Sequence, residues 1–190
     1  MGVYDSINNF SMNFSDGVEN QSGIQEEAYF IPLSWMSTVA KPELGTTAAS
    51  IVEIPKSHMM ANGKKPIPMT PLYKKSGLKA SLEGEELSKM FKQGPAEFFI
   101  PQVTADILGT AAAIRNYRGI VLIKRPGNDT DFIQIGSQGL AANVTNAEID
   151  LGTGPTGSVG IKITFEACGS VPFYIYKGGL PAAAAATKSS

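Results

Sequence analysis

The sequence has few of the residues from which catalytic and metal sites are usually built. Its 190 residues include one cysteine, Cys168, and one histidine, His58. A single cysteine excludes an intramolecular disulfide, and a single histidine leaves no cluster with zinc-ligand spacing. A Ser-His-Asp triad would depend on His58 alone, so we interpret it as a solvated or packed loop residue, and Cys168 as a small strand residue.

Excess charge of one sign and long apolar runs are also missing. The formal net charge is −1, so the chain lacks the basic surface that a protein built to bind free nucleic acid would carry. It has no apolar run of about 18 residues, and its first residues lack the positive and apolar segments of a signal peptide. We therefore expect no membrane segment, and synthesis in a cytoplasm.

Two short motifs match cofactor or catalytic signatures but stand in the wrong context. Residues 152–157 fit the G-x-G-x-x-G pattern, which binds a dinucleotide only where a helix follows it. Here a strand-like alternation follows, and Pro155 removes one backbone amide. The Ser-x-x-Lys pattern at residues 76–79 is not followed by Ser-Asp-Asn. No pair of acidic residues converges either, so we predict no enzyme activity, no cofactor and no metal site.

A helix followed by a hairpin is the clearest pattern in the chain. Residues 104–116 predict the helix, with Thr104 as its N-cap. Its apolar face would contain Ile107, Leu108, Ala111 and Ile114. Residues 120–125 begin with four consecutive apolar side chains, as in a strand covered on both faces. The turn formers at 126–130 and the alternation at 131–135 complete the hairpin, so we predict that 120–125 is a central strand.

Further strands are predicted on both sides of this hairpin. The cleanest alternation is at residues 158–168. Its apolar face would contain Val159, Ile161, Ile163, Phe165 and Ala167, and its solvated polar face Lys162, Thr164 and Glu166. Shorter strands are predicted at 25–32, 51–54, 78–82, 95–101, 147–151 and 171–176, and one or two helical turns at 85–92. The pattern predicts a mostly β protein: an antiparallel β-sandwich or half-barrel with one packed α-helix.

The chain divides into one domain with irregular ends. Residues 1–23 are polar and rich in Asn and Ser, which predicts an extended N-terminal arm. Residues 24–178 would form a single β-sandwich domain with a long proline-rich loop over 41–77, and the Ala-rich residues 179–190 a flexible tail. These features favour a protein completed by contacts between its own copies. The alternative is a monomeric sandwich with irregular ends.

Three stretches, in this order, resemble phage tail tube proteins, also called major tail proteins. The first is residues 16–30, which open a strand with a Gly-Ile-x-x-x-x-Tyr-Phe pattern. The second is the helix with the hairpin that ends at Gly136, and the third is residues 150–165, a glycine-rich turn leading into a strand. The likeness lies in layout and composition, and it extends over most of residues 16–176.

The resemblance implies a structural virion protein that assembles into stacked, hexameric rings around a channel for DNA, which passes without specific binding. The arm and the long loop would reach the next ring. The implied inter-ring contacts are Pro55, His58, Met59, Met60, Lys64, Lys65, Pro66, Phe10 and Phe14, and the implied lumen face is Lys162, Thr164 and Glu166. Expected partners are copies of the chain, the tape measure and the tail terminator, in the virion tail after synthesis in the host cytoplasm.

Two other functions are compatible with the sequence. One is a different virion β-domain, such as a head-tail joining or capsid decoration protein. The other is a ligand-binding β-sandwich, for instance a carbohydrate module. Such a module would display exposed aromatic side chains, for which Tyr174 and Tyr176 are the candidates.

Overall fold

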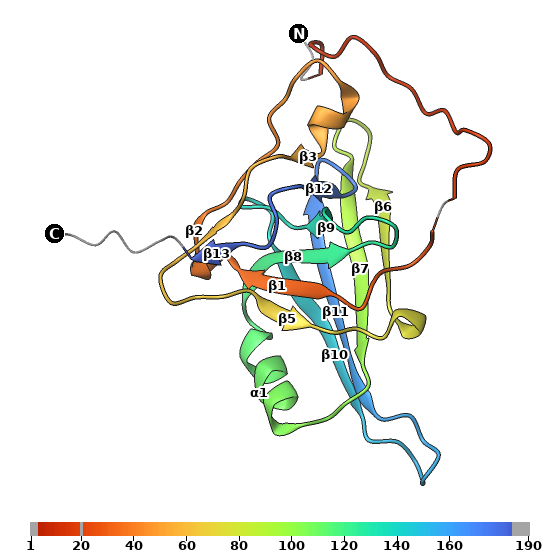
Figure 1. The fold of residues 1–190 in the computed structure, drawn as a ribbon, viewed down its shortest axis with the longest axis vertical. Coiled ribbons are helices and arrows are strands. Elements are labelled where there is room, and N and C mark those ends of the chain that lie inside the picture. The colour runs from red at the N-terminus through yellow and green to blue at the C-terminus, as the bar shows by residue number, and fades with distance from the viewer. Residues whose placement is uncertain (1–3, 20, 184–190) are drawn as a thin grey trace, which may run out of the picture.

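The computed structural model describes residues 4–19 and 21–183, which form a mostly β protein with one α-helix among them (Figure 1). The larger sheet contains β1 (Ala28–Pro32), β3 (Glu53–Ile54), β5 (Ile67–Met69), β6 (Gly77–Glu83), β7 (Met90–Ile100), β8 (Arg118–Lys124), β9 (Phe132–Ile135), β10 (Ala142–Asp150), β11 (Gly160–Gly169) and β12 (Tyr174–Tyr176). A smaller sheet contains β2 (Met36–Thr38), β4 (Met59–Met60) and β13 (Ala182–Ala183). The predicted fold class, β-rich with a single packed helix, is confirmed.

The larger sheet is almost entirely antiparallel. Its main path runs β3-β12-β9-β8-β10-β11-β7-β6, and β12 with β3 is the one parallel pair along it. β1 pairs with β8 as well, and β5 pairs with β1. The ten strands therefore branch at β8 rather than following one another in a flat row.

Strand β8 is central, as its four consecutive apolar residues predict. It pairs with β9 and β10 on one edge and with β1 on the other. Val121 and Ile123 belong to one apolar cluster, whereas Ile120 and Leu122 belong to a second. Because both faces of β8 are covered, neither face needs polar side chains.

Two glycines allow the chain to pass from β9 to β10 along the same edge of β8. Gly136 has a φ of +80°, and a Cβ there would lie 2.7 Å from the amide nitrogen of Ala142. Gly119 lies where β1 and β10 flank β8, and a Cβ there would collide with the carbonyl oxygen of Ile31. Larger residues at either position would separate strands that the two clusters require to be close.

Helix α1 (Ala105–Ile114) covers the cluster that contains Val121 and Ile123. The Oγ1 of Thr104 accepts a hydrogen bond from the amide of Ile107, which confirms the predicted N-cap. Ile114 is buried, and Ile107 and Ala111 pack against the cluster. Leu108, which the spacing places on the apolar face, is partly exposed instead.

The segment predicted as a long loop contains short ordered pieces. Within residues 41–77 the structure has β3, β4, β5 and the 3-10 turns η2 (Ala48–Ile51) and η3 (Tyr73–Lys75). These pieces pair with strands far away in sequence: β3 with β12, β4 with β2 and β13, and β5 with β1. Two- and three-residue strands carry too few side chains for their alternation to show in the sequence.

Strand β7 is longer than predicted, and the helical turns predicted at 85–92 are wrong. β7 begins at Met90 and continues through Gly94 and Pro95 to Ile100. The pairing register with β11 shifts between Phe165 and Ala167, opposite this Gly-Pro pair. A proline within a paired strand is normally confined to such an irregularity. Because Pro95 interrupts the alternation, the sequence pattern did not predict that β7 is one continuous strand.

The described part of the C-terminal segment is also paired. Ala182 and Ala183 form β13, parallel to β4, within the tail predicted as flexible. The rest of that predicted tail, from residue 184 on, lies outside the described residues. Across residues 4–19 and 21–183 no helix is both long and apolar enough to cross a membrane.

Candidate assembly surfaces

Several strands of the larger sheet lack a partner on one side within the described chain, and the two longest open sides belong to β6 and β10. β6 pairs only with β7, so one side of Gly77–Glu83 is open. β10 pairs with β8 only at Ala142 and Asn143, so residues 144–150 pair with β11 alone. Figure 1 shows β10 and β11 projecting beyond the body of the protein. Open backbone donors and acceptors are the usual template for pairing with another strand.

The predicted polar face of β11 consists of charged pairs around a buried hydroxyl. The Nζ of Lys162 lies 3.0 Å from the Oε1 of Glu97, and Glu166 lies 3.2 Å from Lys92, both across the β11–β7 pair. Glu166 raises the pKa of Lys92. Thr164 lies between these pairs and is only 7% exposed, so its placement on a solvated face is wrong. Each charge on β11 has an opposite charge on β7, which leaves little net charge here.

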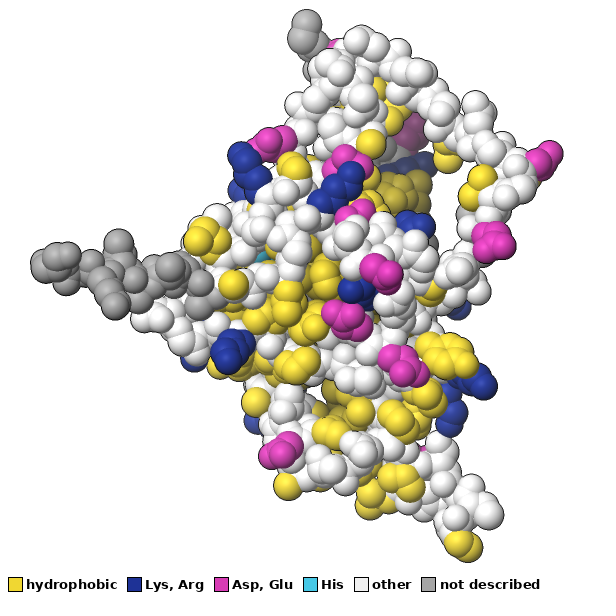
Figure 2. All heavy atoms as spheres, viewed as in Figure 1, with side chains coloured by type: hydrophobic (Ala, Val, Ile, Leu, Met, Phe, Trp, Pro, Cys, Tyr) yellow, Lys and Arg dark blue, Asp and Glu magenta, His cyan; other side chains and the backbone are white. Residues whose placement is uncertain are grey.

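The N-terminal arm touches the body at its start and leaves it again. Ile7 is buried, and Asn9 bridges to Thr47 in a single parallel β-bridge. From there the arm follows an open arc beside the body (Figure 1). Figure 2 shows uncovered hydrophobic side chains along this arm. Phe10 is 62% and Phe14 80% exposed, as expected of side chains that contact another molecule.

The residues predicted as contacts from the long loop separate into exposed and buried ones. Pro55, Lys64 and Lys65 are exposed, Met59 is 42% exposed, and Pro66 is half-buried. His58 and Met60 are buried in the chain itself, so their prediction as contacts is wrong. Lys64 also lies over the ring of Trp35, 4.9 Å from its centroid.

The buried His58 holds the loop against the sheet. Its Nδ1 accepts from the amide of Ala40 at 2.9 Å, and its Nε2 donates to the Oε1 of Gln134 at 2.8 Å. The ring stacks on Tyr176 with 4.4 Å between centroids, and the backbone amide of His58 donates to the Tyr176 hydroxyl. Burial lowers the pKa of His58, partly opposed by the hydrogen bond with Gln134. The neutral ring is therefore a structural link, not a contact surface.

From His58 a chain of buried hydrogen bonds crosses the protein. The Nε2 of Gln134 donates to the carbonyl of Gly136 at 3.0 Å, and the amide of Gly136 donates to the Oε1 of Gln93 at 2.8 Å. Gln93 in turn donates to the carbonyl of Val171 at 2.8 Å. This series of hydrogen bonds joins the long loop, β9, β7 and the segment before β12. Sequence reasoning missed both glutamines. Gln134 stands alone among apolar strand residues, which is a signal for a buried hydrogen-bonded side chain, whereas Gln93 lies between Lys92 and Gly94 and has no such signal.

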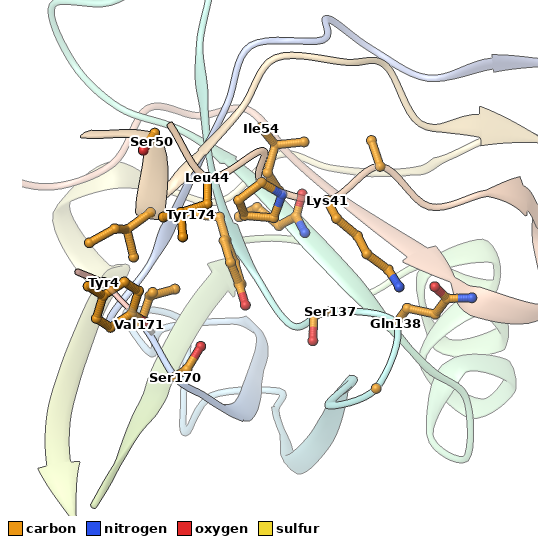
Figure 3. Close-up of a pocket in the computed structure, with 15 residues that line it drawn as sticks. Tyr4, Lys41, Leu44, Ser50, Ile54, Ser137, Gln138, Ser170, Val171 and Tyr174 are labelled. Carbon is orange, nitrogen blue, oxygen red and sulfur yellow. The ribbon is translucent and has the colours of Figure 1, made fainter. Parts of the chain in front are cut away.

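A cavity of about 430 Å³ lies beside this chain (Figure 3). The N-terminal arm, the 40–54 segment, the β9–β10 connection and the β11–β12 connection form its walls. Its lining includes Tyr4, Lys41, Ile54, Ser137, Ser170 and Tyr174. No sequence motif pointed to it, because its walls come from segments that are distant along the chain.

The aromatic pair proposed for carbohydrate binding is not exposed. Tyr176 is fully buried between His58 and Phe132, and Tyr174 is 8% exposed. Neither ring offers an open face on which a sugar could stack. The prediction of an exposed pair at these positions is wrong.

No family model, curated protein or solved structure matches this chain. The assignment of function therefore depends on the surfaces described above. Within the described residues, no cluster of His, Cys, Asp and Glu has the arrangement of a metal site.

Proposed function

We propose that this chain is the subunit of a phage tail tube, a structural virion protein whose copies assemble into stacked rings around a channel for DNA. The observation that carries the proposal is the pair of open strand edges, β6 and β10, at the two ends of the four-strand series β10-β11-β7-β6. Unpaired strands at both ends of such a series make a monomer prone to aggregate. In a ring, the same strands can pair with those of the neighbouring copies.

The direction of the strands suits a ring. Each neighbouring pair in the series is antiparallel, so β6 and β10 run in opposite directions within one copy. In a rotational ring every copy has the same orientation, so β6 of one copy would lie antiparallel to β10 of the next. The joint would repeat the hydrogen-bonding pattern already present within the sheet. The open edges would disappear when the ring closes.

Side chains on the two edges suggest a register. Leu78 and Ala80 lie opposite Ala96 and Gln93, and Ala147 and Ile149 opposite Ile163 and Ile161, all on the core-facing side of the sheet. A register with Leu78 facing Ile149 keeps these apolar side chains on one side. The same register places Lys79 opposite Glu148, an attractive cross-strand pair.

The opposite side of the series is suited to a channel wall. Helix α1 packs on the side that carries Ile161 and Ile163, so the side that carries Lys162 and Glu166 would face away from the helix. On this side, the charges of β11 occur as the ion pairs Lys162–Glu97 and Glu166–Lys92. Affinity for DNA grows with the number of phosphates neutralised, so paired charges would let DNA pass without binding tightly.

Stacking of rings would use the exposed parts of the arm and the long loop. Once the buried His58 and Met60 are removed, the predicted contacts that remain are Phe10 and Phe14 from the arm, and Pro55, Met59, Lys64, Lys65 and the half-buried Pro66 from the loop. The tape measure and the tail terminator remain the expected partners at the inside and the end of such a tube, in the virion tail.

Negative-stain electron microscopy of the purified protein tests the proposal. Hollow tubes or stacked hexameric rings would support it. Isolated rings that never stack would favour a head-tail joining protein. Particles with the form of a cap or a single lattice point would favour a capsid decoration protein. A protein that stays monomeric at high concentration would contradict assembly and favour a ligand-binding sandwich.

A further inference from the structure

The cavity beside the buried hydrogen-bond chain has one apolar side. Ile54, Leu44 and Ile51 come from the 40–54 segment, and Val171 comes from the segment before β12. In Figure 3, Tyr4 of the arm lies next to Val171 and closes this side. An apolar group placed here would be removed from water on more than one side.

The other side of the cavity carries hydroxyl groups. The Tyr174 hydroxyl points into the open space between Ser170 and Ser137 (Figure 3). It has no hydrogen-bond partner among the described residues, and neither has the Ser170 hydroxyl. The Ser137 oxygen accepts from the amide of Leu140, which leaves its own proton to donate. Three donors thus converge on one region.

A single cation completes the lining. Lys41 extends along the rim toward Ser137 and Gln138 (Figure 3). Its ammonium group has no ion pair among the described residues, and no Asp or Glu is among the residues that line the cavity. The amide of Gln134 is already used by His58 and Gly136. The Tyr174, Ser170 and Ser137 hydroxyls can therefore all donate hydrogen bonds to a ligand, and Lys41 is the one charged residue in the lining.

We propose that this cavity binds a carboxylate attached to an apolar group. The apolar side would receive a ring or branched chain, and the carboxylate would accept from Lys41 and the Tyr174 hydroxyl. A volume of about 430 Å³ lies within the range of small-ligand sites, roughly 300–1,000 Å³. This site is independent of the edges used for assembly, because none of its lining residues belongs to β6, β10 or β11.

The chemistry fits two sources, a free small acid and the C-terminal carboxylate of a peptide. Three probes distinguish them: indole-3-propionate, its primary amide, and the peptide Gly-Gly-Trp with a free C-terminus. Saturation-transfer NMR of the purified protein, which works for monomers and large assemblies alike, measures each. We expect the free acid to bind with a dissociation constant on the order of 0.1–1 mM and the amide at least about tenfold more weakly. Binding of Gly-Gly-Trp as well would identify a peptide terminus as an accepted source, and its exclusion would restrict the site to free acids.

Two variants and one control locate the binding. Lys41→Gln should weaken binding of the acid about tenfold while leaving binding of the amide unchanged. Tyr174→Phe should also weaken binding of the acid, with the fold retained. Lys89→Gln, which removes an exposed lysine that is not among the lining residues, should leave the affinity for the acid unchanged. Equal binding of acid and amide, an unchanged affinity in Lys41→Gln, or no saturation transfer at about 10 mM acid would each overturn the proposal.

Discussion

His58 and Gln134 are joined by a 2.8 Å hydrogen bond between groups 76 residues apart in sequence. Because the Nδ1 of His58 accepts from the amide of Ala40, the ring proton must lie on Nε2 and the imidazole must be neutral. A second proton would set two donors, Nδ1–H and the Ala40 amide, against each other. The folded state therefore opposes the charged ring by geometry, in the same direction as the effect of burial on its pKa.

The first prediction is that stability falls in mild acid. In the unfolded chain His58 has its ordinary pKa of about 6.5, whereas its pKa in the folded chain is lower. Between these values the unfolded chain binds more protons, so the free energy of unfolding decreases as the pH falls below about 6.5, by up to about 1.4 kcal/mol per unit. Above that pH His58 is neutral in both states, so its contribution to the free energy of unfolding is fully present. Urea denaturation at pH 7.5 and pH 5.5 measures the difference.

His58→Gln supplies the control for this prediction. The variant has no group that titrates in this pH window at this position, so its free energies of unfolding at the two pH values should differ less than those of the parent. At pH 7.5 the variant should be less stable than the parent, because it lacks the hydrogen bonds of the imidazole. A parent protein that is equally stable at both pH values would contradict a neutral histidine locked between Ala40 and Gln134.

The second prediction concerns Gln93. Replacing it by Leu leaves the amide of Gly136 and the carbonyl of Val171 buried without partners. We expect a loss of about 2–4 kcal/mol in the free energy of unfolding, because each orphaned group costs about 1–3 kcal/mol. Gln138→Leu, which changes a residue on the rim of the cavity, should stay within about 0.5 kcal/mol of the parent. Chemical denaturation measures both. Equal losses in the two variants would show that the buried hydrogen bonds of Gln93 do not contribute to the free energy of unfolding.

The third prediction tests the joint between copies. Lys79→Glu and Glu148→Lys should each place like charges opposite each other and reduce the fraction of protein in rings or tubes. The double variant restores the opposite pair and should recover assembly. Sedimentation velocity at low and high salt measures the assembled fraction, and high salt should weaken all these differences. If the double variant assembles no better than the single ones, this register is wrong.

The fourth prediction tests the arm. Phe10→Ser combined with Phe14→Ser should leave the free energy of unfolding within about 0.5 kcal/mol of the parent, because both side chains are exposed in the single chain. Stacking should nevertheless be reduced, and Phe→Leu at both positions should retain it. Tube length in electron micrographs is the measurement. Normal tubes in the serine variant would exclude the arm as a stacking contact.

Prediction from the sequence succeeded where one local pattern was sufficient. The consecutive apolar residues of β8 identified a strand covered on both faces, and Thr104 marked the start of α1 correctly. It failed where partners are distant in the chain: His58 is paired with residues 18 and 76 positions away, and nothing near it indicates burial. Gly94 and Pro95 interrupted the alternation of β7 and hid half of that strand.

Because β8 contributes to both apolar clusters, neither half of this domain has a boundary along which it could separate from the other. Local damage on one side would be transmitted to the other through a single shared strand. Heating should then produce one cooperative melting event, so a subunit would be either wholly folded or wholly lost from its assembly.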